Sequence, residues 1–157
     1  MEEKLKKLTY YLKEQKYTFA EGSEPMPCEM YIDLSIFSDE KDFNPFELTQ
    51  ILQIEPTETY YKGDMIRKNL YRKETCWHLK TSRIETFEFE EVFQILKSIL
   101  GDKTEILGQY AKENNLFVKI VPVIVVSNNM PSIIITEEIA KTLLLLNAVI
   151  EFDMYFA

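Results

Sequence analysis

Glycine is scarce in this chain, with four glycines among 157 residues. Loops that cradle nucleotide phosphates are rich in glycine, because a backbone without side chains can approach the phosphate closely. The segment Lys62-Gly63-Asp64 has no glycine-rich run ahead of its lysine, as a P-loop would need. We therefore interpret it as a turn and expect no nucleotide-cradling loop in this protein.

Cysteine and histidine are also rare: the chain has Cys28, Cys76 and a single histidine, His78. Cys76 and His78 share one face of a predicted strand at a spacing of two. Metal sites usually recruit three or four ligands, so this pair alone does not make one. We interpret both as ordinary strand side chains and expect no metal and no cofactor. The two thiols are expected to be reduced, since nothing in the sequence indicates secretion.

Long apolar runs are absent as well. The longest candidate, residues 139–150, is shorter than the roughly 18–20 residues that a membrane helix needs. The first residues are Met1, Glu2, Glu3 and Lys4, and no apolar region follows them. These features predict a soluble, cytoplasmic protein without a signal peptide or a membrane span.

What is present suits one ordinary core, with 46% hydrophobic and 28% charged residues. The net charge of −8 is unevenly distributed. Residues 1–20 carry +2 and residues 60–83 carry +5, so the remainder carries −15. A strongly acidic protein repels nucleic acid and anionic membranes at long range and attracts basic partners.

The hydrophobic pattern divides the chain into two parts. Residues 2–17 show the spacing of an amphipathic helix, and the Gly- and Pro-containing stretch 21–27 breaks it. We predict an N-terminal helical extension and linker at residues 1–24 and a single α+β domain at 25–157.

Within this domain, periodicity and capping signals predict an alternation of strands and helices. Strands are expected at 31–37, 75–81, 116–126, 133–135 and 149–156, and helices at 44–54, 89–100, 102–115 and 136–146. Residues 57–74 look polar and turn-like. Pro122 indicates an edge, a bulge or a break in its strand. The order predicts a ferredoxin-like, antiparallel-dominated sheet with helices on one face and an inserted helix pair, in which Trp77 is buried.

Several short segments resemble one known family. They are Ile32-Asp33-Leu34-Ser35-Ile36, the helix from Pro45 to Ile54, Ile54-Glu55-Pro56-Thr57, Lys62-Gly63-Asp64, Trp77-His78-Leu79 and the block from Ile135 to Phe156. From Tyr31 onward, about four-fifths of its length, the chain resembles the bacterial domain-of-unknown-function family 4279. The leading helix is not part of that pattern, and the stretch between Asp64 and Trp77 is long for it. The family has no catalytic motif to carry over. The resemblance implies a small, acidic, stand-alone protein of the kind that accompanies bacterial toxins.

Three carboxylates are the first candidate site. In a ferredoxin-like order the first and last strands are neighbours, so Asp33 would meet Glu151 and Asp153 on the face opposite the helices, and Lys119 could join them. Adjacent carboxylates raise one another's pKa and can perform acid–base chemistry or hold a divalent cation. The other interpretation is a solvated face with cross-strand charge pairs, which we favour.

Two tyrosines extend this candidate site. Tyr31 and Tyr155 have the sequence parity that places them on the same face as these carboxylates. Tyrosine is an anchor of low conformational entropy, and carboxylates steer a basic partner, so the set suits a protein-binding face.

A second candidate surface is basic and aromatic. Its residues are Tyr60, Tyr61, Arg67, Lys68, Tyr71, Arg72 and Lys73. Positive charge beside stacking rings is typical of single-stranded nucleic-acid binding. A solvated loop that balances an acidic body is the alternative, and the acidic composition favours it.

These observations support three hypotheses about function. The first is a non-catalytic interaction protein, an immunity-type inhibitor that binds a basic toxin. The second is a small-ligand-binding protein or enzyme that uses Asp33, Glu151 and Asp153. The third is an RNA-associated adaptor that uses residues 60–83. The sequence does not specify an oligomeric state.

Overall fold

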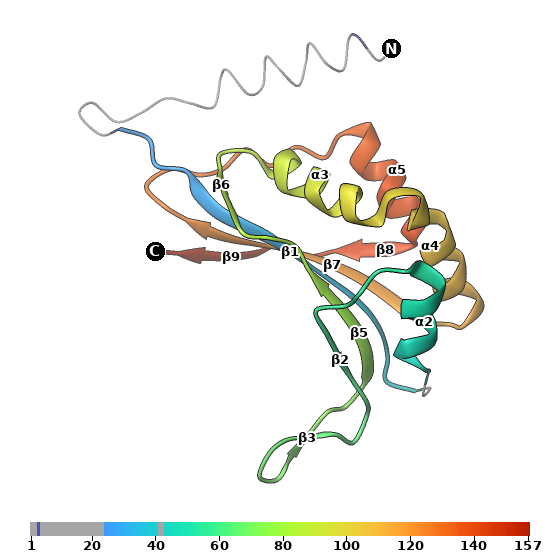
Figure 1. The fold of residues 1–157 in the computed structure, drawn as a ribbon. Coiled ribbons are helices and arrows are strands. Elements are labelled where there is room, and N and C mark those ends of the chain that lie inside the picture. Colours follow the sequence, from blue (N-terminus) through green and yellow to red (C-terminus); the bar gives the residue numbers. More distant parts are fainter. Residues whose placement is uncertain (1–2, 4–23, 41–42) are drawn as a thin grey trace.

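The computed structural model describes residue 3 and residues 24–40 and 43–157 (Figure 1). The helix predicted over residues 2–17 therefore lies, apart from residue 3, outside the described residues. The described part is a mixed α+β structure in which the helices cover one face of a twisted sheet (Figure 1).

The central strand of the sheet is β1, which is antiparallel to β5 and β6 on one side and to β7 on the other. β2 extends the sheet beyond β5, and β8 and β9 lie beyond β7 and run parallel to it. The predicted antiparallel-dominated sheet is thus confirmed. The bounds are β1 (Cys28–Ser38), β2 (Glu58–Tyr60), β5 (Thr75–Lys80), β6 (Ile84–Thr86), β7 (Phe117–Val126), β8 (Ala148–Ile150) and β9 (Asp153–Phe156).

The strand order differs from the expected ferredoxin-like order. The last strands, β8 and β9, are not neighbours of β1, because β7 lies between them. Both edges of β1 are already occupied, by β5 and β6 on one side and by β7 on the other. The helix that follows β7 returns the chain along the sheet, and such a crossover makes the next strand a parallel neighbour.

Local signals set the helix ends. The helices are α2 (Pro45–Leu52), α3 (Phe89–Leu100), α4 (Thr104–Glu113) and α5 (Glu137–Leu146). Asn44 caps α2 by accepting from the Phe46 amide, and Thr136 caps α5 by accepting from the Ile139 amide. α4 begins without a side-chain cap, because a 3₁₀ turn over residues 101–103 leads directly into that helix. No helix in the described part of the chain is long and apolar enough to cross a membrane.

The core lies between the sheet and the helices. Every second residue of β1 points into it, and these residues are fully buried: Cys28, Met30, Ile32, Leu34 and Ile36. Apolar side chains from all four helices complete the cluster. Trp77 of β5 is fully buried, as predicted, and its indole Nε1 donates to Thr49 Oγ1 of α2 at 3.0 Å.

Two predicted strands have a different form in the structure. Residues 133–135 make no strand, because the backbone of Ser132 bonds instead to Phe87 and Phe89 at the start of α3. The strand expected over 149–156 is divided into β8 and β9, with Glu151 and Phe152 between them.

Pro122 explains that division. Ile120 accepts a hydrogen bond from the Glu151 amide, so every second residue of β7 presents its backbone polar groups to β8 and β9. Pro122 is one of these residues and has no N–H to present. β7 itself runs unbroken through Pro122, so the break predicted in that strand does not occur, and the interruption lies in the pairing of β7 with its outer neighbours.

The segment over residues 57–74 contains more regular structure than its polar sequence suggested. β2 occupies its beginning, and a separate two-stranded sheet follows, formed by β3 (Met65–Arg67) and β4 (Leu70–Tyr71). Asn69 lies in the left-handed region at φ 62°, which asparagine tolerates in turns. Lys62-Gly63 forms a turn, as expected.

Candidate binding face

The helices leave one face of the sheet uncovered, and this open face holds the candidate residues. Its side chains on β1 alternate with the buried ones and are half-buried: Glu29, Tyr31, Asp33, Ser35 and Phe37. The sheet register then places each neighbouring strand on the same face. Asp33 lies opposite Lys80 of β5 and Val121 of β7, and Ser35 lies opposite His78 and Lys119.

All five residues of the first candidate site lie on this open face. Asp153 pairs with Val123 and Tyr155 with Val125, and both valines share the face of Tyr31. Because β7 lies between β1 and β9, Asp33 and Asp153 are two strand spacings apart, roughly 10 Å. Two carboxyl groups that share a proton or an ion must be much closer. The expectation that these carboxylates meet is therefore wrong.

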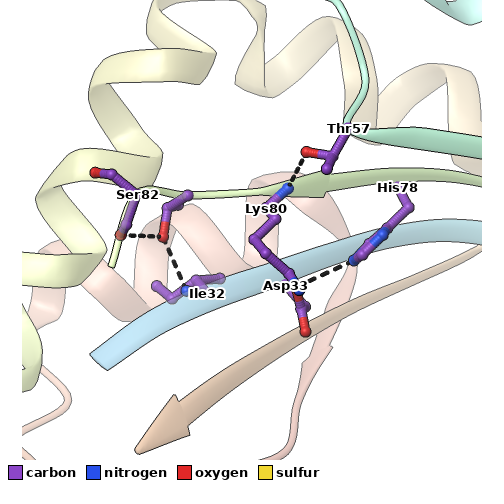
Figure 2. Close-up of polar contacts among 7 residues, drawn as sticks. Ile32, Asp33, Thr57, His78, Lys80 and Ser82 are labelled. Atoms are coloured by element: carbon purple, nitrogen blue, oxygen red, sulfur yellow. Dashed lines mark hydrogen bonds and ion pairs between the residues drawn. The ribbon is translucent and has the colours of Figure 1, made fainter. Parts of the chain in front are cut away.

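Asp33 contacts two side chains of β5 instead. Its Oδ1 lies 3.2 Å from His78 Nε2 and 3.8 Å from Lys80 Nζ (Figure 2). The Lys80 amide donates to Thr57 Oγ1 at 2.8 Å, which fixes this end of β5 (Figure 2). Just beyond it, Thr81 Oγ1 accepts from the Ile32 amide at 2.9 Å. These contacts make Asp33 the centre of a cross-strand charge cluster.

Tyr31 is surrounded by positive charge. The Lys80 Nζ lies 4.9 Å from its ring centre, and the Arg83 guanidinium carbon lies 5.1 Å from it. Arg83 also pairs with Glu29 at 2.8 Å. Cations over an aromatic face are attracted by its quadrupole, so the ring holds both side chains near the middle of the open face.

The carboxylates beside β7 have separate partners. Glu151 forms an ion pair with Lys119, the lysine that was expected to join the site. Asp153 accepts a hydrogen bond from the Tyr155 hydroxyl at 2.7 Å. This hydrogen bond is the main cause that raises the pKa of Tyr155, because it stabilises the protonated phenol beside a carboxylate. The open face therefore carries charge pairs between neighbouring strands, which is the interpretation favoured from the sequence.

Cys76 and His78 both face this side of β5, but the thiol is buried beneath its neighbours. Burial is the largest cause that raises the pKa of Cys76, although hydrogen bonds to Tyr60 and Ser35 oppose it. A thiol with a raised pKa stays protonated and is a poor nucleophile or metal ligand. Both cysteines are free and buried. Among residues 24–40 and 43–157, no group of three or more His, Cys, Asp or Glu side chains is placed to hold a metal ion.

The second candidate surface divides into a fixed part and an exposed part. Tyr60 is half-buried in β2, and the Arg72 guanidinium lies 3.9 Å above its ring. Tyr61, Arg67, Lys68 and Tyr71 are exposed in and around β3 and β4. Met65, Ile66 and Leu70 are exposed apolar residues of this surface that were not among its predicted residues. Two apolar pairs on either side of Arg67-Lys68-Asn69 were the available signal for a hairpin.

Comparison with known proteins identifies one family. A family model described as "Domain of unknown function (DUF4279)" matches residues 28–157, from the first residue of β1 to the end of the chain. No curated protein and no solved structure matches the chain. The match covers both the sheet and all four described helices, so the chain belongs to the DUF4279 family.

Proposed function

We propose that this chain is a non-catalytic interaction protein, an immunity-type inhibitor of the bacterial cytoplasm that binds a basic toxin. Its binding site is the part of the open face that contains Tyr31, Asp33, Glu151, Asp153 and Tyr155.

The observation that carries this proposal is the row of exposed side chains that β8 and β9 place along the edge of the open face. Tyr155 and Val149 in this row are 53% and 64% exposed, and Phe117, at the start of β7 on the same face, is 58% exposed. Glu151 is exposed beside them. In the described structure no basic side chain is within ion-pair distance of Asp153. Apolar and aromatic groups flanked by carboxylates at the surface are suited to a basic protein surface.

The spacing of the carboxylates supports binding over catalysis. Asp33 is held by His78 and Lys80, and Glu151 is held by Lys119. An acid–base pair or a cation site would need carboxylates that share one location, whereas these are separated by a strand. The overall charge of −8 also favours rapid association with a basic partner.

The test begins with capture of the partner from the native host by the full chain, followed by binding kinetics on the purified pair. The test variant is Glu151→Gln with Asp153→Asn. Asp33 is left intact, because its replacement would release His78 and Lys80. We expect association to slow by about tenfold and to depend less on salt, because steering charges are removed. A Tyr155→Ala variant should increase the dissociation rate.

The matched control removes the same charge from the helical side, as Glu105→Gln with Glu137→Gln. It should associate at the rate of the unmodified protein. The proposal is wrong if the control and test variants behave alike, or if the recovered partner is acidic. A turnover or metal-binding signal that the test variant abolishes would favour the ligand-binding alternative instead.

A further inference from the structure

The hairpin, defined here as residues 61–73, exposes several apolar side chains, because so short an element has no core in which to bury them. Every residue from 61 to 71 is exposed. The large apolar side chains among them are Tyr61, Met65, Ile66, Leu70 and Tyr71. β3 and β4 pair with each other and project from the body beyond β2 and β5 (Figure 1). Apolar groups gathered on a projecting element indicate a surface that another molecule covers.

The base of the hairpin is fixed, although its tip buries nothing. Arg72 pairs with Glu58 at 3.1 Å and stacks over Tyr60, whose hydroxyl donates to Glu74 at 3.2 Å. Lys62 Nζ donates to the Asp39 carbonyl at 2.7 Å. A two-stranded hairpin alone is at best marginally stable in water, so these contacts determine its direction. The tip is therefore held in place before any partner arrives, which lowers the entropic cost of binding.

The charge of the hairpin indicates which kind of molecule would bind it. The hairpin carries +4, whereas the rest of the chain carries −12. A nucleic acid or an anionic membrane carries negative charge along its whole length and would meet the acidic body as well as the hairpin, whereas a protein can present a local acidic patch to the hairpin alone. The exposed apolar side chains nearest the tip, Met65, Ile66 and Leu70, are also not aromatic, whereas binding of single strands relies on rows of stacking rings. An acidic protein surface with apolar groups matches the hairpin in both respects.

This chain itself displays such a surface across α2 and α4. We call it the acceptor surface and define it by Phe46, Glu47, Ile51, Ile106 and Tyr110. Phe46, Ile51 and Ile106 are 62%, 38% and 41% exposed. Glu47 lies near Tyr110: burial and then the Glu47 carboxylate raise the pKa of that tyrosine. The acceptor surface therefore combines exposed apolar side chains with a carboxylate.

The hairpin and the acceptor surface lie at the same end of the molecule. The base of the hairpin contacts Asp39, which precedes α2 by only a few residues. We propose that two copies of this chain form a closed dimer, in which the hairpin of each copy binds the acceptor surface of the other. Such a reciprocal contact buries the hairpin and the acceptor surface of both copies, so neither surface remains exposed to bind a third copy. It is independent of the open face and of the toxin-binding proposal.

The test measures the mass of the full chain by sedimentation equilibrium over about 1–100 µM, a range suited to a moderately stable dimer. We expect a dimer at low salt whose dissociation constant rises at least about tenfold when salt is raised to molar concentration. Arg67→Glu with Lys68→Glu in the hairpin, and Glu47→Lys in the acceptor surface, should each give a monomer. Lys141→Glu on α5 is the matched control and should remain a dimer. All of the substituted residues are exposed, and Glu47 and Lys141 lie on helices. Each variant should therefore keep the circular dichroism spectrum of the unmodified protein, which checks that it is folded.

Mixing the two monomeric variants provides the decisive result. In a reciprocal dimer, the reversed hairpin then faces Lys introduced at position 47, and the native hairpin of the second copy faces native Glu47. Both contacts are complementary, so the mixture should recover the dimer mass. The proposal is overturned if the unmodified chain is monomeric throughout, if the charge-reversed variants stay dimeric, or if mixing restores nothing. A monomer whose hairpin instead binds a single-stranded oligonucleotide or an anionic vesicle would also overturn it.

Discussion

Gly108 of α4 lies directly against the backbone of Leu145 in α5. A Cβ built on Gly108 would be 1.8 Å from the carbonyl oxygen of Leu145 and 3.0 Å from the Cα of Leu146. The obstacle is backbone, which cannot rotate away as a side chain can. This contact determines how closely the two helices pack on the sheet.

Gly108→Ala is expected to destabilise the fold by about 3 kcal/mol or more, the upper range for overpacking a core, because α4 and α5 must move apart. Urea denaturation followed by circular dichroism measures the change. Gln109→Ala, one residue along α4 and exposed, should alter the free energy of unfolding by less than about 0.5 kcal/mol. Equal stability of the two variants would contradict the close contact.

Thr49→Val tests the hydrogen bond that joins α2 to the core of the sheet. Valine has nearly the shape of threonine but accepts no hydrogen bond, so the buried Trp77 indole N–H loses its partner. We expect a loss of about 1–3 kcal/mol in the free energy of unfolding. Thr49→Ser keeps the acceptor and should recover part of the loss. Trp77 is the only tryptophan, so its fluorescence follows the transition directly. A valine variant as stable as the serine variant would be evidence against the bond.

The stability of the fold is expected to depend on pH through Glu138. The hydrogen bond from Lys97 is the main cause that lowers its pKa from the usual 4.5, and Gln94 contributes. Because the folded-state pKa is lower than the unfolded one, the contact stabilises the fold above about pH 4.5 and is lost as the pH falls through the lowered value. The pair is half exposed, so Glu138→Gln should cost less than about 1 kcal/mol at pH 7. That difference should disappear in acid, and a difference that persists would contradict this assignment.

Removal of residues 1–24 is expected to leave a folded domain, because the family match and β1 both begin at residue 28. The truncated chain keeps the bond from the Met26 amide to Asn128 Oδ1 at 2.9 Å. Its melting temperature should fall by less than about 10 °C, which corresponds to a few kcal/mol at this size. A second truncation that removes residues 1–27 loses the Met26 contact and should melt lower. A first truncation that fails to fold would show that residues 1–24 belong to the core.

Much of the fold could be predicted because the signals are local. Asn44 with Pro45, Gly101 and Thr136 each mark a helix end through their own backbone or side-chain chemistry. The alternation in β1 likewise predicted which of its side chains are buried. The strand order could not be read in this way, since it depends on which edges remain unoccupied after β1, β5 and β7 have paired. β3 and β4 were missed because strands of three and two residues are too short to show a regular alternation.

The contacts within the candidate site were likewise beyond prediction from local sequence patterns. Sequence parity alone assigns Tyr31, Asp33 and Tyr155 to one face. It cannot specify that His78 and Lys80 balance Asp33, or that Lys119 balances Glu151, because those contacts require the register between strands. Because β7 lies between them, Asp33 and Glu151 contact separate partners rather than each other.

The position of β8 and β9 has a consequence for synthesis on the ribosome. β7 is a long and strongly apolar strand, and within the described structure its outer hydrogen-bonding edge is paired only by residues 148–150 and 153–156. Until those residues have been synthesised, the nascent chain presents an unpaired apolar edge to other chains. Translation that stalls before residue 148 would therefore release a fragment prone to aggregation, although it already contains β1, β5 and every helix of the described fold.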